Sequence, residues 1–198
     1  MEPDWTRVFE RLRVRAKSYG VDVRIEELAD ETTGTFDGLS ITTNQRCDEA
    51  TRCHNLAHSL GHILQWTTER AKQEGLYARL HAAKALKTSD ARTLEACLVE
   101  FRAYEEEASE YAAWLLTEIG APECIPAFTC FARADIECIV GYHRDGLMPI
   151  WRDFIAEWNA RVARHETTLR PFAPRPIPPF TAAPMAEQEI IQEEDGIA

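Results

Sequence analysis

The sequence predicts an α+β fold, in which a small sheet of about three strands precedes a mostly helical body. Residues 21–43 contain short segments of alternating apolar and polar residues, punctuated by glycine and rich in threonine, a pattern typical of strands. From residue 48 onward, apolar residues recur at helical spacing instead. We therefore expect one α+β domain over residues 1–168.

The first elements should be a helix and the strands of the sheet, over residues 5–19, 21–25 and 34–43. Asp4 can cap the helix, and Gly20 can end it. The third segment, GTFDGLSITT, favours a hairpin that turns at Asp37 and Gly38.

Helices should then cover about residues 48–74, 76–87, 90–119, 124–144 and 149–167. We expect Gly75 to break the first from the second. Ser89 or Asp90 can cap the third helix, which Gly120 and Pro122 should close.

After Leu169 the composition changes. Residues 170–184 are rich in proline and the end of the chain is acidic, so too little apolar area is available to order the segment. This predicts a disordered tail over residues 169–198, with a polyproline-type docking segment as the alternative.

The composition excludes several classes of function. A net charge of −11 argues against direct nucleic-acid binding, which needs clustered Lys and Arg. No apolar run approaches the roughly 20 residues of a membrane span, and the N-terminus lacks an apolar signal-peptide core. We expect a cytoplasmic protein whose six cysteines are reduced thiols, without a C-x-x-C pair for a zinc knuckle.

The stretch NLAHSLGHILQW carries the strongest functional signal. His54, His58 and His62 fall on one stripe of the predicted helix, and leucines occupy the opposite face. Two imidazoles four residues apart can bind one metal ion without distortion of the backbone. Gly61 is costly inside a helix, so a close approach of backbone or ligand is expected there.

LAHSLGHILQ resembles the LAHELGHxL helix of the ImmA/IrrE family of zinc metallopeptidases. The segment GLSITT before it resembles the end of that family's small sheet, and LVEFRAYEEEASEYAAWLL after it resembles the helix that supplies the third ligand. The resemblance covers residues 21–120. It implies a zincin-like domain, a zinc ion, and a protein or peptide partner such as a repressor-type regulator.

The resemblance assigns His58 and His62 as metal ligands, because the residues flanking this pair match the family helix on both sides. His54 is then expected to be a surface residue or to support the ligands. For the third ligand we favour Glu100 over Glu105: Glu100 lies in an apolar stretch, where a cation would offset the cost of burying a carboxylate. Glu105 begins a run of three glutamates that is typical of a solvated face.

Ser59 occupies the position at which the family has its catalytic glutamate. A serine hydroxyl is too weak a base near neutral pH to activate water, and Asn55, in the other pairing, is no base either. We therefore expect a degenerate metallopeptidase that retains a metal- and peptide-binding cleft. The alternatives are an active zinc-dependent peptidase with a substituted base, for which Tyr142 and His143 are candidates, and a metal-free helical interaction module.

Overall fold

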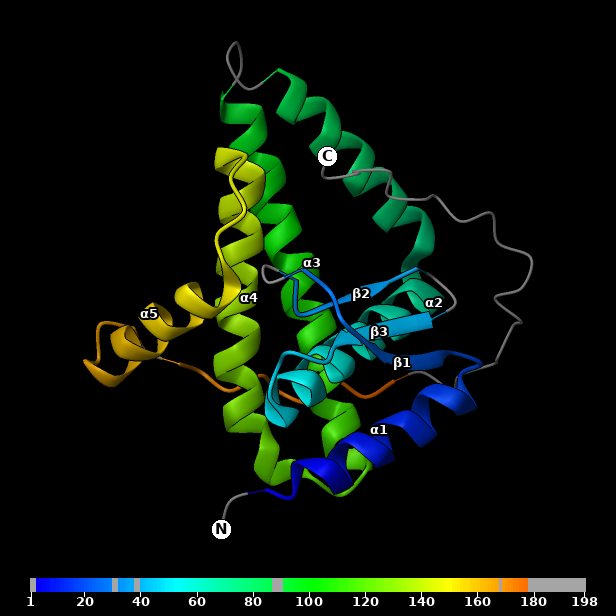
Figure 1. Cartoon of the computed structure of the whole chain (residues 1–198). Coiled ribbons are helices and arrows are strands. Elements are labelled where there is room, and N and C mark those ends of the chain that lie inside the picture. The colour runs from blue at the N-terminus through cyan, green and yellow to red at the C-terminus, as the bar shows by residue number, and fades with distance from the viewer. Residues whose placement is uncertain (1–2, 30–31, 38–39, 87–90, 168, 178–198) are drawn as a thin grey trace.

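The computed structural model describes residues 3–29, 32–37, 40–86, 91–167 and 169–177. It confirms the α+β class, because a three-stranded sheet near the N-terminus precedes a body of long helices (Figure 1). In chain order the elements are α1 (Trp5–Ser18), β1 (Asp22–Glu26), β2 (Gly34–Phe36), β3 (Ser40–Asn44), α2 (Glu49–Ala85), α3 (Ala91–Glu118), the short 3-10 helix η1 (Pro122–Cys124), α4 (Ile125–Asp145) and α5 (Trp151–Ala163). Of the helices in this part of the chain, none combines the length and apolarity needed to cross a bilayer.

The sheet has the order β1–β3–β2. β3 pairs in parallel with β1 and antiparallel with β2, and every residue of this central strand is buried. β2 and β3 form the predicted hairpin. Asp37 begins its turn by accepting the backbone N–H of Ser40 at 2.6 Å, whereas Gly38 lies outside the described residues.

Helix α1 begins and ends as predicted. The Asp4 carboxylate accepts the backbone N–H of Arg7 at 3.1 Å, which satisfies an N–H of the first turn that has no partner within the helix. Gly20 adopts a φ of 78° directly after the helix, a conformation that glycine reaches without steric cost.

The expected break at Gly75 is wrong, because α2 runs without interruption from Glu49 to Ala85. One glycine costs a helix only about 1 kcal/mol, and no proline or capping residue follows it. The apolar residues beyond it, Leu76 and Leu80, are buried, so their packing outweighs this cost. Figure 1 shows that α2 changes direction midway along its length.

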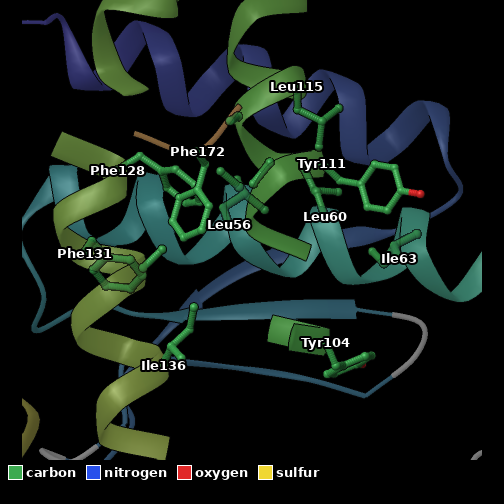
Figure 2. Close-up of a cluster of buried hydrophobic side chains, with 14 of the residues drawn as sticks. Leu56, Leu60, Ile63, Tyr104, Tyr111, Leu115, Phe128, Phe131, Ile136 and Phe172 are labelled. Atoms are coloured by element: carbon green, nitrogen blue, oxygen red, sulfur yellow. The ribbon is translucent and has the colours of Figure 1, made fainter. Parts of the chain in front are cut away.

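Helices α2, α3 and α4 enclose the main core (Figure 2). Leu56, Leu60, Leu115 and Phe128 are almost completely buried there. α3 ends as predicted at Gly120, with a φ of 73°, but its expected caps at residues 89 and 90 lie outside the described residues.

Three ion pairs connect α3 to α4 along one edge of their contact, one of them between Arg144 of α4 and Glu95 of α3. Arg102 of α3 binds Glu137 of α4 through both carboxylate oxygens, and Arg133 of α4 binds Glu106 of α3. These pairs fix the position of α4 along α3.

Residues 169–177 pack against the helices, so the domain extends beyond the predicted boundary at residue 168. The side chain of Phe172 is buried and lies beneath the guanidinium of Arg133, 4.1 Å from the ring centroid. Arg175 binds the carboxylate of Glu107 at 2.7 Å and that of Glu110 at 3.5 Å. Disorder of the tail stays a prediction for residues 178–198, which lie outside the described part of the chain.

Candidate metal centre

Gly61 determines how closely α2 and α3 approach. A Cβ atom at this position would lie 2.1 Å from the carbonyl oxygen of Ala108 on α3, so only glycine permits this contact between the two backbones. The expected close approach at Gly61 is confirmed, and its partner is backbone. The contact brings Glu105, one turn before Ala108, against the two histidines that flank Gly61.

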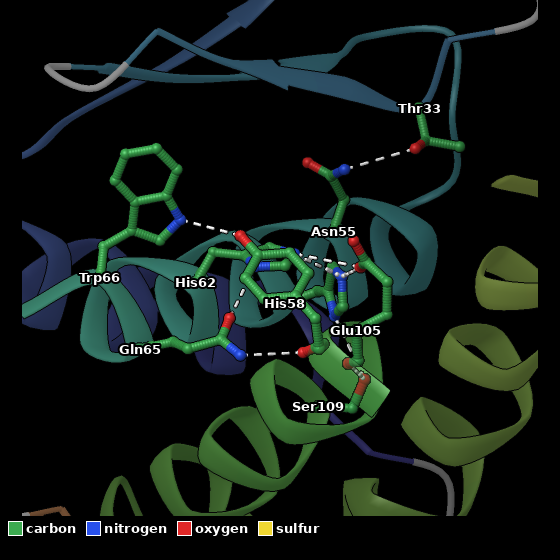
Figure 3. A network of polar contacts seen from close by, with 9 residues as sticks. Thr33, Asn55, His58, His62, Gln65, Trp66, Glu105 and Ser109 are labelled. Carbon is green, nitrogen blue, oxygen red and sulfur yellow. Dashed lines mark hydrogen bonds and ion pairs between the residues drawn. The ribbon is translucent and has the colours of Figure 1, made fainter. Parts of the chain in front are cut away.

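Three ligand atoms converge at this crossing (Figure 3). The Nε2 atoms of His58 and His62 lie 3.0 Å apart. One carboxylate oxygen of Glu105 lies 3.1 Å from the first and 3.2 Å from the second. The side chains of His58, His62 and Glu105 are only 8 %, 17 % and 4 % exposed. This group could hold a metal ion.

The choice of Glu100 as third ligand is corrected by this geometry. Glu100 lies on the outer face of α3, where its exposed carboxylate binds Arg79. Glu105 is five residues further along, so it projects from a different face, which meets α2. The run of three glutamates is therefore not one solvated face, because its first member points inward while Glu106 and Glu107 bind the arginines of α4 and of the C-terminal segment.

The tautomer of each histidine is fixed by its other ring nitrogen. Ser109 Oγ donates its hydrogen to the carbonyl oxygen of Glu105 at 2.9 Å, so it can only accept from His58 Nδ1, 3.3 Å away. His62 Nδ1 donates to the amide oxygen of Gln65 at 3.2 Å. Both Nδ1 atoms thus carry hydrogen and both Nε2 atoms face the site, as in histidines that bind metals. Binding of a metal would require His62 to release the second proton, which its Nε2 atom carries in the metal-free state.

Gln65 is itself held in place. Its amide nitrogen donates to the carbonyl oxygen of Tyr104 at 2.9 Å and to the Glu107 carboxylate at 2.8 Å, which leaves the amide oxygen facing His62. The Tyr104 ring stacks on the His62 ring, with 5.0 Å between centroids, and its hydroxyl accepts from Trp66 Nε1 at 2.8 Å. The position and the orientation of His62 are therefore both constrained.

The electrostatic environment of the site favours a positive charge between the three side chains. Burial disfavours the ionised form of Glu105, but the positive charge of His62 and the close contacts of both imidazoles outweigh burial and hold its pKa well below the usual range. Burial likewise opposes the charge on His62, yet the carboxylate of Glu105 raises the pKa of this imidazole. Burial lowers the pKa of His58. Without a cation, a proton on His62 balances the carboxylate.

The ligand set fits zinc in kind and in spacing. Zn²⁺ binds imidazole nitrogen and carboxylate oxygen at about 2.0–2.2 Å, so tetrahedral geometry separates its ligand atoms by about 3.3–3.6 Å. The separations of 3.0–3.2 Å between the three ligand atoms need only a small outward adjustment. Three protein ligands leave a fourth position for water.

The other predicted residues lie away from these ligands. His54 is neither a surface residue nor a neighbour of the ligands. It is buried with its ring centroid 5.0 Å from that of Trp5 and 5.3 Å from that of Phe131, because this turn of α2 packs on α1 and α4. Tyr142 and His143 lie in the last turn of α4, where both approach Lys84 near the end of α2.

Three residues near the ligands were not predicted from the sequence: Gln65, Ser109 and Asp135. Gln65 and Ser109 lie three and four residues after His62 and Glu105, at the spacing of neighbours on one helix face. Asp135 lies on α4 in the segment CFARADIECIV, where a half-buried carboxylate among apolar residues is itself a signal for a functional role.

Comparison of the chain with models of protein families, with curated proteins and with solved structures gives no match. The resemblance to the ImmA/IrrE family therefore rests on the motif around His58 and His62 and on its flanking segments.

Proposed function

We propose that this chain is a zinc-binding protein whose site resembles that of the ImmA/IrrE metallopeptidases but lacks the glutamate that normally activates water. The observation that carries the proposal is the convergence of two imidazole lone pairs and one carboxylate oxygen in a buried place. Such a group is costly to bury unless positive charge compensates it, and here only one shared proton does so.

The arrangement of the surrounding side chains favours this proposal over a purely structural role for the histidines. The ring nitrogens of a structural core histidine also need hydrogen-bond partners, but those of two such histidines have no reason to face one common point. Here the second nitrogen of each ligand histidine donates to an oxygen that is itself held by further hydrogen bonds. This second layer of contacts orients the lone pairs toward one point, as is usual at metal sites.

Metal content of the purified full-length chain tests the proposal. After zinc loading and desalting, we expect about one zinc ion per chain, which the His58→Ala/His62→Ala double variant should lose. Glu105→Gln should weaken zinc binding more than tenfold, because it replaces a charged ligand, whereas Glu100→Gln is a matched control on the same helix that should bind like the wild type. A wild-type chain that retains no zinc would refute the proposal. Equal losses in the two glutamate variants would refute the assignment of Glu105.

The proposed ligand of the site, beyond the metal, is a protein or peptide segment, such as part of a repressor-type regulator, as the resemblance implies. Among the three metal ligands, His62 has the most exposed side chain, so we expect a partner to approach on its side of the site. Because Ser59 cannot accept a proton from water near neutral pH, hydrolysis would require an acceptor from another element.

A further inference from the structure

Asp135 lies where α4 meets the histidine helix. The ring of Phe131, on α4, lies 5.3 Å from the ring of His54, on α2. One turn further along each helix come Asp135 and His58, and residues four apart lie on the same face of a helix. The contact between Phe131 and His54 therefore places Asp135 one turn beyond a point at which α4 touches the histidine helix. The ion pairs Arg102–Glu137 and Arg133–Glu106 place it at the level of Glu105 on α3.

The side of α4 on which Asp135 lies agrees with this alignment. Arg133 and Glu137 mark the edge of α4 that is tied to α3 by ion pairs. Ala134, about 100° further round the helix, is fully buried. Asp135 follows by another 100° or so and lies between Phe131 and Ala132, which are both buried.

Asp135 is a partly buried carboxyl without a hydrogen-bonding partner among the described residues. Among the described residues it makes no hydrogen bond or ion pair, although it is half-buried between Ala134 and Ile136. Burial, and after it the negative charge of Glu105 on α3, raise the pKa of its carboxyl to about 7 against the opposing charge of His62 on α2. These are the influences expected of a carboxyl beside the metal ligands.

Asp135 is close to the site but is not one of its ligands. Within the described residues, the group of ligand atoms that lie within 4.8 Å of one another consists of His58, His62 and Glu105. A carboxylate near this group but outside it could meet a bound ion only through a water molecule.

We propose that Asp135 is the proton acceptor of this site and replaces, from α4, the glutamate that Ser59 displaces on α2. The inference rests on the proposed zinc site. The carboxylate of Asp135 accepts a hydrogen bond from the water in the fourth position. With the metal bound, the carboxylate would take one proton from this water and become a neutral carboxylic acid, so that charge and atoms are conserved. A carboxylate held next to the bound water can take this role whichever helix supplies it.

Cobalt(II) substitution of the full-length chain tests the proposal without a substrate. The visible absorption of bound Co²⁺ is followed from pH 5 to 10 with Co²⁺ in excess, together with its dissociation constant. In the wild type we expect a spectral transition below pH 8 without loss of the ion. In Asp135→Asn the transition should move up by at least one pH unit, a tenfold change in the proton equilibrium, while the dissociation constant changes less than threefold. Asp135→Glu should restore part of the shift.

Glu137→Gln is the matched control, because it removes a carboxylate from the same helix on the edge that faces Arg102. Its transition should coincide with that of the wild type. An unchanged transition in Asp135→Asn, with cobalt still bound, would overturn the role of Asp135 and leave the metal site standing. A more than tenfold loss of cobalt affinity would instead make Asp135 a fourth ligand and also overturn the proposal.

The wild-type protein alone provides two further tests. A wild type that binds no cobalt would overturn both this inference and the proposed zinc site. If Asp135→Asn fails to fold, the wild type itself decides, because a transition above pH 9 would show that no nearby acceptor assists the water.

Discussion

Replacement of Gly61 by alanine tests the crossing of α2 and α3 on which the site depends. Alanine favours a helix over glycine by about 1 kcal/mol, so propensity alone predicts a stabilised protein. The new Cβ, however, would lie 2.1 Å from the carbonyl oxygen of Ala108, where a carbon and an oxygen normally remain at least about 3.3 Å apart. The helices would have to separate by about 1 Å.

The cost of that separation exceeds the gain. Overpacking a core costs about 1–3 kcal/mol, and the upper value applies here because the atom that clashes is backbone and cannot rotate away. After subtraction of the gain in helix propensity, we expect Gly61→Ala to lower the free energy of unfolding by about 2 kcal/mol. Zinc affinity should fall as well, because Glu105 moves away from His58 and His62 together with α3.

Gly75→Ala is the matched control on the same helix. A Cβ there would meet only the end of the Arg79 side chain, at 3.4 Å, which is an ordinary contact with a flexible group. This variant should gain about 1 kcal/mol of stability from helix propensity and bind zinc as the wild type does.

Urea unfolding followed by circular dichroism measures both variants, and chelator competition measures their zinc affinity. The expected changes in stability have opposite signs, although the two substitutions are chemically identical. If Gly61→Ala stabilised the protein as much as Gly75→Ala does, the close contact between the backbones of α2 and α3 would be refuted.

Three other substitutions test separate parts of the structure. Gln65→Leu removes the acceptor for His62 Nδ1 and should weaken zinc binding by about 10–100-fold in chelator competition; unchanged affinity would show that Gln65 does not orient the ligand. Burial lowers the pKa of His54 from 6.5 to about 4, so the unfolded chain binds this proton first and stability should fall as the pH drops from 6.5 to 4, by up to about 3 kcal/mol. Urea unfolding of His54→Phe over this range should lack that part of the slope, and parallel curves for variant and wild type would contradict the assignment. Phe172→Ala should lower the unfolding free energy by about 3 kcal/mol, and an unchanged thermal melt would mean that the C-terminal segment does not contribute to the core.

The sequence was sufficient for features that depend on local pattern. Strand alternation and helical spacing predicted the sheet and the helical body, and the four-residue spacing placed His58 and His62 on one face of α2. Gly61 was also informative, because a glycine inside a helix has a local cost that some tertiary contact must offset.

Features that depend on the packing of distant segments were not accessible in the same way. The choice between Glu100 and Glu105 required knowledge of which face of α3 meets α2, and both glutamates lie near apolar residues in the sequence. Continuation of α2 through Gly75 depends on the burial of the leucines that follow it. The ordering of residues 169–177 likewise depends on a place for Phe172 between helices, which proline content alone cannot reveal.

The C-terminal segment is connected to the metal site by a continuous series of contacts. Arg175 binds one oxygen of the Glu107 carboxylate, the other oxygen accepts from Gln65, and Gln65 holds His62. The two equilibria are thermodynamically linked. If docking of this segment strengthens metal binding, metal binding strengthens docking by the same free energy. Occupancy of the site would thus change the exposure of residues 169–177 to proteases, and removal of this segment would in turn weaken metal binding.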